Sequence, residues 1–262
     1  MRTPRSLGAF SFSGKFADDS GRKTIRKSIF EMRYEPQPHF FDKRGAILDQ
    51  LYRDQSGSAN FTHWQLRDSR VDVFEPAFDR LCFVSFRNAG YHVEYQPSDN
   101  YFRDQVRKYM RIPLEHLDLR HLVRIGIRAG FVHPVGSFDE TVKRIARALY
   151  RTDDPRFNEL TKDLVDVQAI PFICKEGRYS FRIQAGAMRA TEYEELSLFN
   201  KFQGLPEFSL WVDIDYSTTG LDLGTDPHKT VMEFIERAEE RVAQKHDLFM
   251  KMTLGGPGDG RR

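Results

Sequence analysis

The fold is decided by residues 121–149, which read HLVRIGIRAGFVHPVGSFDETVKRIARAL. From Val123 to Phe131, apolar residues alternate with arginine and glycine, which predicts a strand with one buried face. A turn is expected at 133–136, and Ser137 precedes Glu140 by three residues, the spacing of a helix capping box. Apolar residues then recur as one helical stripe, at Phe138, Val142, Ile145, Ala146 and Leu149. The stretch therefore predicts a strand, a tight turn and a helix, each of which needs a partner surface.

Outward from this stretch, two halves of the chain follow the same order of elements: strand, helix, several strands, helix. Residues 25–118 form the first half and residues 119–254 the second, with weak sequence identity between them. In the first half, Asn88-Ala89-Gly90 predicts a hairpin turn. A unit used twice in this way predicts an α+β fold with two pseudo-repeats, antiparallel strands and helices on one sheet face. The layout resembles the TATA-binding-protein-like fold, a likeness of fold that carries no function with it.

Positive charge is concentrated at the start of the chain. The 262 residues have a net charge of +2, yet residues 1–27 hold seven basic and two acidic side chains. The remaining body is therefore slightly acidic. Residues 1–24 mix Gly, Ser, Arg and Phe without periodicity, which predicts a flexible basic tail, and residues 255–262 predict a second flexible tail.

Composition also bears on the expected compartment. Cys82 and Cys174 both lie in apolar runs, so we expect two buried thiols that act as small hydrophobic side chains rather than a disulfide framework. No stretch approaches the ~18 consecutive apolar residues of a membrane span. The first residues are basic but lack the apolar core of a secretory signal. The sequence predicts a cytoplasmic protein with no membrane partner.

One pair of residues offers a hint of enzymatic chemistry. Asp213 and Asp215 form a D-x-D on a predicted strand, where alternate side chains share a face about 7 Å apart. Both carboxylates can then reach one divalent cation such as Mg²⁺ or Mn²⁺. The alternative, which we favour, is that arginines of neighbouring strands pair with them.

The face that carries these aspartates is the candidate binding surface. If the apolar face of each strand packs on helices, the opposite face carries charged side chains and one large aromatic ring. Its expected members are Glu31, Arg33, Arg124, Arg128, Arg182, Gln184, Trp211, Asp213 and Asp215. Such a face can bind a polar partner or small ligand through its charges and the flat ring of Trp211. It can equally be a solvated surface whose ion pairs each contribute ~0–1 kcal/mol.

Common catalytic and cofactor motifs are missing from the sequence. The eight histidines do not cluster, and no zinc-type spacing of His or Cys occurs. The glycine-rich nucleotide motifs and the G-x-S-x-G of serine hydrolases do not occur either. Nucleic-acid binding is favoured by the basic tail and by the likeness of fold, but the acidic body opposes it because phosphate neutralisation dominates such affinity.

Four stretches together carry a family resemblance. They are IFEMRYEPQPHFFDKRGAILDQL (29–51), HLVRIGIRAGFVHP (121–134), FSLWVDIDY (208–216) and DPHKTVMEFIERAEERVAQKHDLFMKMTL (226–254). Their order and spacing resemble a sporadically distributed, uncharacterised prokaryotic family of α+β proteins of roughly this length, and the resemblance covers most of residues 25–254. It implies no established activity. A patchy distribution is typical of mobile or antiviral-defence genes of bacteria, so the resemblance implies that kind of context.

The sequence predicts, on balance, a non-catalytic binding or scaffold protein without a cofactor. Its partner is expected to be a protein or an unknown ligand that contacts the charged sheet face. One alternative is a metal-dependent phosphodiester- or nucleotide-processing enzyme that uses Asp213 and Asp215. A second alternative is a nucleic-acid-binding protein.

Overall fold

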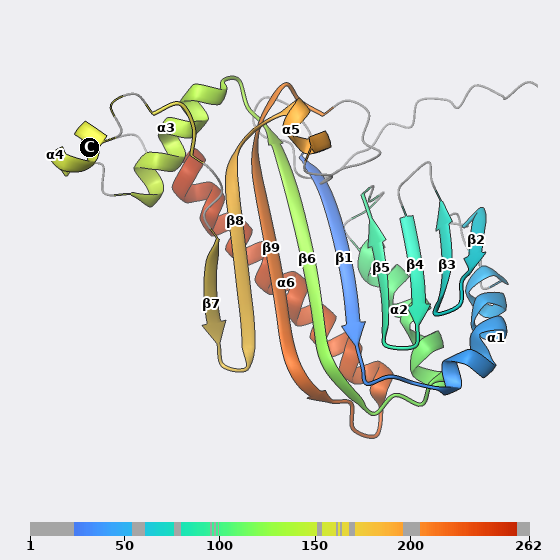
Figure 1. The fold of residues 1–262 in the computed structure, drawn as a ribbon. Coiled ribbons are helices and arrows are strands. Elements are labelled where there is room, and N and C mark those ends of the chain that lie inside the picture. The colour runs from blue at the N-terminus through green and yellow to red at the C-terminus, as the bar shows by residue number, and fades with distance from the viewer. Residues whose placement is uncertain are drawn as a thin grey trace, which may run out of the picture.

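A computed structural model provides the coordinates. It describes residues 24–53, 61–75, 80–94, 96, 98, 100–150, 154–160, 162, 164–167, 171–195 and 205–255. The two predicted tails, 1–24 and 255–262, therefore lie outside the described residues except for Thr24 and Gly255. The chain is of the α+β class, with antiparallel strands and helices in separate layers (Figure 1).

All described strands join one nine-stranded antiparallel sheet. Their order across the sheet is β2-β3-β4-β5-β1-β6-β9-β8-β7. In chain order the strands are β1 (Ile25–Arg33), β2 (His63–Leu66), β3 (Arg70–Glu75), β4 (Arg80–Ser85), β5 (Asn88–Val93), β6 (His121–Pro134), β7 (Phe172–Glu176), β8 (Tyr179–Arg189) and β9 (Phe208–Asp222). The long strands β1 and β6 pair at the centre, so the segment that decides the fold also joins the two halves of the sheet.

Helices cover one face of the sheet, which we call the helix face. They are α1 (His39–Arg53), α2 (Tyr101–His116), α3 (Phe138–Leu149) and α6 (Pro227–Leu254). In Figure 1, α2 and α6 pass behind the strands. Alternate strand residues point at them: Tyr91 of β5 lies 6.0 Å from Phe102 of α2, and Tyr216 of β9 lies 5.8 Å from Phe234 of α6, between ring centroids. This buried layer holds most of the apolar core.

The central strand and the helix that follows it match the prediction, with one shift. Ser137 is the N-cap of α3, and its Oγ accepts a hydrogen bond from the Glu140 N–H at 3.3 Å. Strand β6 is longer than predicted, because His133 and Pro134 still pair with Leu210 and Ser209 of β9. The turn is therefore confined to the short link after Pro134.

The hairpin turn predicted at 88–90 is wrong by two residues. Asn88 begins β5, and the chain turns at Phe86 and Arg87. The Oγ of Ser85 accepts from the N–H of Arg87 at 3.2 Å and of Asn88 at 3.0 Å, which fixes the turn earlier. Gly90 serves a different purpose: a Cβ there would lie 2.5 Å from the Phe30 carbonyl oxygen of the adjacent strand.

A pair of buried histidines ties the central strand to the last helix. Nε2 of His133 in β6 lies 2.8 Å from Nε2 of His246 in α6, and the two rings are stacked. Nδ1 of His133 lies 3.0 Å from Oγ1 of Thr24, and Nδ1 of His246 lies 3.5 Å from Asp247. Burial lowers the pKa of His246, which favours the neutral form of this ring within the contact.

The expectation that all helices lie on one face needs a correction. The short helix α5 (Ala190–Glu195) lies on the opposite face, at one end of β8 and β9. Its Tyr193 is buried there against Val132, Met188 and Trp211, which point away from the helix face. A further short helix, α4 (Pro155–Leu160), precedes β7. Among the described helices, none combines the length and the apolar character needed to cross a membrane.

Candidate binding face

The face opposite the four long helices, which we call the open face, displays the charged residues that the sequence singled out. Alternate residues of β1, β6, β9 and β8 point to it, and the antiparallel registers align them side by side. We call seven of these residues the ionic cluster: Glu31, Arg33, Arg124, Arg128, Arg182, Asp213 and Asp215. The prediction that they share one face is met, because strand periodicity alone sets it.

Arg128 and Asp213 form the ion pair that contains the most buried carboxylate of this cluster. Nε of Arg128 donates to both carboxylate oxygens of Asp213, at 2.9 and 3.0 Å. The Asp213 side chain is 7% exposed, whereas that of Arg128 is 44% exposed. Burial raises the pKa of Asp213 and outweighs the hydrogen bond and charge of Arg128, which lower it. The carboxylate therefore depends on this arginine for compensation.

Arg124 and Asp215 form a second pair that spans two strands diagonally. Nη2 of Arg124 lies 2.9 Å from each carboxylate oxygen of Asp215. The guanidinium reaches this position by crossing Gly126: a Cβ at Gly126 would lie 3.1 Å from both Arg124 terminal nitrogens. The R-x-G sequence of β6 thus supplies both the donor and the space through which it passes.

The remaining members flank these two pairs. Arg33 donates through Nε and Nη2 to the two oxygens of Glu31, each at 3.0 Å, and Asn88 donates to the same carboxylate. Burial pushes the pKa of Glu31 upward, but the hydrogen bonds from Arg33 and Asn88 outweigh it, so the pKa lies below its usual value. Arg182 of β8 is the register partner of Asp215 of β9, and its positive charge lowers the pKa of Asp213.

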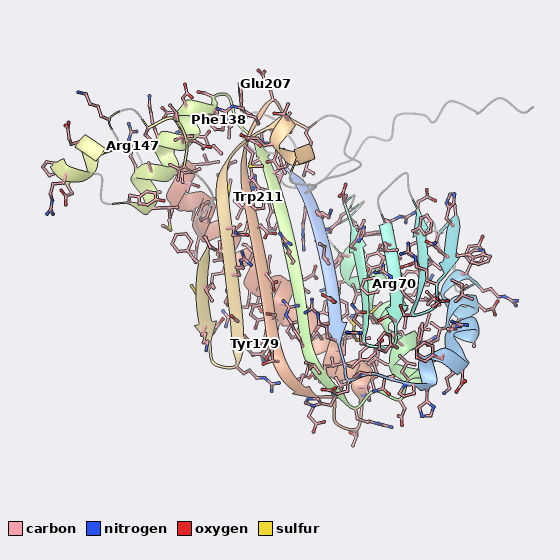
Figure 2. The ribbon with its side chains drawn as sticks, viewed as in Figure 1. Arg70, Phe138, Arg147, Tyr179, Glu207 and Trp211 are labelled. Carbon is pink, nitrogen blue, oxygen red and sulfur yellow. The ribbon has the colours of Figure 1, made fainter. Side chains whose placement is uncertain are left out.

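Trp211 does not present the flat contact surface that the sequence suggested. It is on the open face (Figure 2), but only 6% exposed, because it packs in one buried cluster with Tyr193 of α5. The Tyr193 hydroxyl lies 2.7 Å from the Ser209 Oγ, which fixes the helix in place. Periodicity placed Trp211 on the correct face but contained no information about a cover contributed from another part of the chain.

The geometry also bears on the metal hypothesis. Both oxygens of Asp213 and both oxygens of Asp215 already accept hydrogen bonds from arginine, so a cation would compete with two guanidinium groups for these carboxylates. Within the described part of the chain, no group of three or more His, Cys, Asp or Glu side chains is arranged to hold a metal ion. The two aspartates of the D-x-D are the acidic partners in an ion-pair network with Arg124 and Arg128.

The strand registers reveal a feature that the sequence analysis missed. One row of open-face residues runs across all nine strands, each paired in register with the next, and we call it the central row. Its members, from β2 to β7, are His63, Phe74, Leu81, His92, Ile29, Arg128, Asp215, Arg182 and Ile173. Every member is at least partly exposed, whereas the adjacent row is interrupted by the buried Asp72, Gly90 and Gly126.

Comparison of the chain with known protein families and with curated proteins gives no match.

Proposed function

We propose that the chain is a non-catalytic binding or scaffold protein whose partner, a protein, contacts the open face. The observation that carries this proposal is the exposure of arginine N–H groups on a face where the carboxylates are already bound. The side chains of Arg33 and Arg128 are 54% and 44% exposed. Arginine stays protonated at every ordinary pH, so these groups bind anions but transfer no protons. The face is therefore suited to recognition rather than to acid–base chemistry.

A site-specific crosslink tests this proposal without altering the charge of the face. Ser180 of β8 lies on the open face, in register with Ser217, and is replaced by p-benzoylphenylalanine in the full chain. The matched control carries the same group at Arg147, an exposed residue of α3, which lies beside the β7–β8 edge of the sheet (Figure 2). On irradiation in extracts of the native cell, a protein adduct from Ser180 but not from Arg147 supports the proposal. Equal adducts from both positions, or none from Ser180, would refute it.

The proposal includes a duplicated architecture of the TATA-binding-protein-like kind. The strand order supports it: β1 and β6 each open one half, and each lies beside the last strand of its own half, β5 or β9. Each half also ends in a long helix that packs behind its strands. Membership of the sporadic prokaryotic family, a defence-associated setting and a cytoplasmic location belong to the same proposal and rest on the sequence resemblance and composition.

The two alternative functions receive less support. A metal-dependent reaction at Asp213 and Asp215 would require a cation to compete with the two arginines that already neutralise these carboxylates. Nucleic-acid binding would require a face with a larger excess of positive charge, whereas the ionic cluster holds four arginines and three carboxylates. A Mg²⁺-dependent or Mn²⁺-dependent activity that Asp213→Asn abolishes would reinstate the first alternative.

A further inference from the structure

The central row divides the open face into two chemically different halves. From β2 to β1 it is mainly apolar and aromatic, with His63, Phe74, Leu81, His92 and Ile29. From β6 to β8 it is ionic, with Arg128, Asp215 and Arg182, and the exposed Ile173 of the edge strand β7 ends the row. The boundary falls between the central strands, where Ile29 and Arg128 are direct register partners. One row thus offers apolar surface and guanidinium groups within one strand spacing of each other.

The apolar half is partly uncovered, and contacts of its aromatic rings order the part that lies on β2 and β3. The rings of His63 and Phe74 stack with centroids 5.3 Å apart. In the adjacent row, the Arg70 guanidinium lies 4.1 Å over the Phe83 ring and fixes it. Phe74, Leu81 and Ile29 remain partly exposed. A rigid apolar surface loses little conformational entropy when a partner covers it, so it favours binding.

In the ionic half, guanidinium N–H groups of the arginines remain accessible to a binding partner. Arg128 uses only Nε for Asp213, which leaves its two terminal amino groups in a half-exposed side chain. Arg182 is exposed, and it faces the same aspartates from the other side, on β8. Adjacent strands are ~4.8 Å apart, so Arg128 and Arg182 flank Asp215 at about 10 Å between backbones. Each guanidinium can therefore bind a separate carboxylate of a partner, one on either side of Asp215.

We propose that the central row binds a segment of a partner protein whose acidic residues contact Arg128 and Arg182 and whose apolar residues cover Ile29, Leu81 and Phe74. This inference rests on the proposed function and specifies the chemistry of the partner. The distance from Arg182 to Ile29 spans three strand spacings, ~14 Å, and that from Arg182 to Phe74 spans six, ~29 Å. An extended segment of about nine residues covers the longer distance at ~3.3 Å per residue.

Charge complementarity favours an acidic protein segment over a nucleic acid. Asp215 lies between Arg128 and Arg182 in the central row, and Glu31 lies in the adjacent row. A phosphate backbone laid along this row would bring a negative charge against these carboxylates at every nucleotide. A protein segment can instead place single carboxylates on the arginines, pair Asp215 with a donor of its own, and continue as apolar side chains. Mixed arginine and apolar surface is also characteristic of protein interfaces.

The test measures binding of a fluorescein-labelled peptide of about 12 residues, with glutamates at one end and Leu-Phe pairs at the other, by fluorescence anisotropy with the full chain. Arg182→Glu should weaken binding about tenfold or more, because a charge-assisted contact becomes repulsive. Ile29→Thr, which keeps a β-branched side chain, should weaken it about threefold through lost apolar contact. Arg147→Glu on α3 makes the same change of charge away from the open face and should leave binding unchanged.

Arg128 is tested by the double variant Arg128→Gln with Asp213→Asn, which removes the guanidinium without leaving a buried charge. It should weaken peptide binding as Arg182→Glu does, and circular dichroism checks that it folds. Absence of binding by the wild type would overturn the inference, as would equal binding of a peptide with lysines in place of glutamates. Tighter binding of a single-stranded oligothymidine with the same dependence on Arg182 would also overturn it, in favour of nucleic acid. If p-benzoylphenylalanine in place of Ser180 crosslinks a protein while the peptide does not bind, the proposed function stands and only this inference is refuted.

Discussion

Replacing Arg128 by alanine should lower the free energy of unfolding by about 2 kcal/mol, because it leaves the buried carboxylate of Asp213 without its donor. A hydrogen bond to a charged group contributes about 1.5–3 kcal/mol, and breaking a fully buried ion pair costs about 3–5 kcal/mol. The lower range applies here because the Arg128 side chain is 44% exposed, so water can enter the space it vacates. Arg182 also remains close enough for its charge to act on Asp213.

A double-mutant cycle separates this pair from the packing of the arginine stem. Asp213→Asn keeps the volume but removes the charge, and the double variant should recover about 1–2 kcal/mol relative to the sum of the single variants. The cycle through Glu31 and Arg33 is the matched control, because both of those side chains are more exposed than Asp213. It should give a coupling below about 1 kcal/mol. Urea unfolding at neutral pH, with the m-value checked for each variant, measures all of these quantities.

The pH dependence supplies an independent readout of the same pair. Burial already holds the pKa of Asp213 above its usual value, so the folded state binds a proton at pH values where the unfolded state does not. Lowering the pH through that window therefore stabilises the folded state with respect to this group. Removal of Arg128 takes away an interaction that lowers the pKa, so the variant should regain stability relative to the wild type as the pH falls. Three results would refute this reasoning: a loss of unfolding free energy below about 0.5 kcal/mol in Arg128→Ala, additive effects of the two single substitutions, or a destabilisation by Arg128→Ala that does not change with pH.

Three further predictions concern the framework. Wild-type stability should fall as the pH drops below about 6.5, since His246 has a lowered pKa and resists protonation in the folded state. His246→Gln should flatten that dependence in urea titrations, and an unchanged slope would contradict the assignment of a neutral His246. Gly90→Ala should lower the free energy of unfolding by about 1–3 kcal/mol, measured by calorimetry, because the new Cβ meets a backbone oxygen at 2.5 Å. An unchanged stability would show that β1 and β5 can move apart at little energetic cost. Ser137→Ala should cost about 1 kcal/mol through loss of the α3 cap, and Ser137→Asp, which retains an acceptor, should not.

The ionic cluster could be predicted in its members because side-chain alternation along a strand is local. Arg124 and Arg128 in β6, like Asp213 and Asp215 in β9, lie an even number of residues apart and therefore share a face whichever strands lie beside them. Their partners could not be predicted, because pairing depends on register. Arg128 is the register partner of Asp215 but bonds Asp213, and Arg124 reaches Asp215 across Gly126.

The same distinction explains what the sequence missed. The central row contains one residue from each strand, so it exists only once eight pairings are in register. No single strand shows a signal for it, since Ile29, Leu81 and Phe74 each read as an ordinary apolar residue. The cover over Trp211 is likewise supplied by Tyr193, which is 18 positions along the chain from it.

The amino-acid sequence by itself determined the central strand and the helix that follows it, the cap of α3, the α+β class and the face on which the ionic side chains lie. These properties follow from backbone geometry and from interactions within a few residues. Only the tertiary structure decided which arginine compensates which aspartate, that α5 covers Trp211, and that apolar and ionic side chains line up in one exposed row. Those features are contacts between distant segments, and a shift of one residue in any strand pairing would turn every side chain of that strand to the other face.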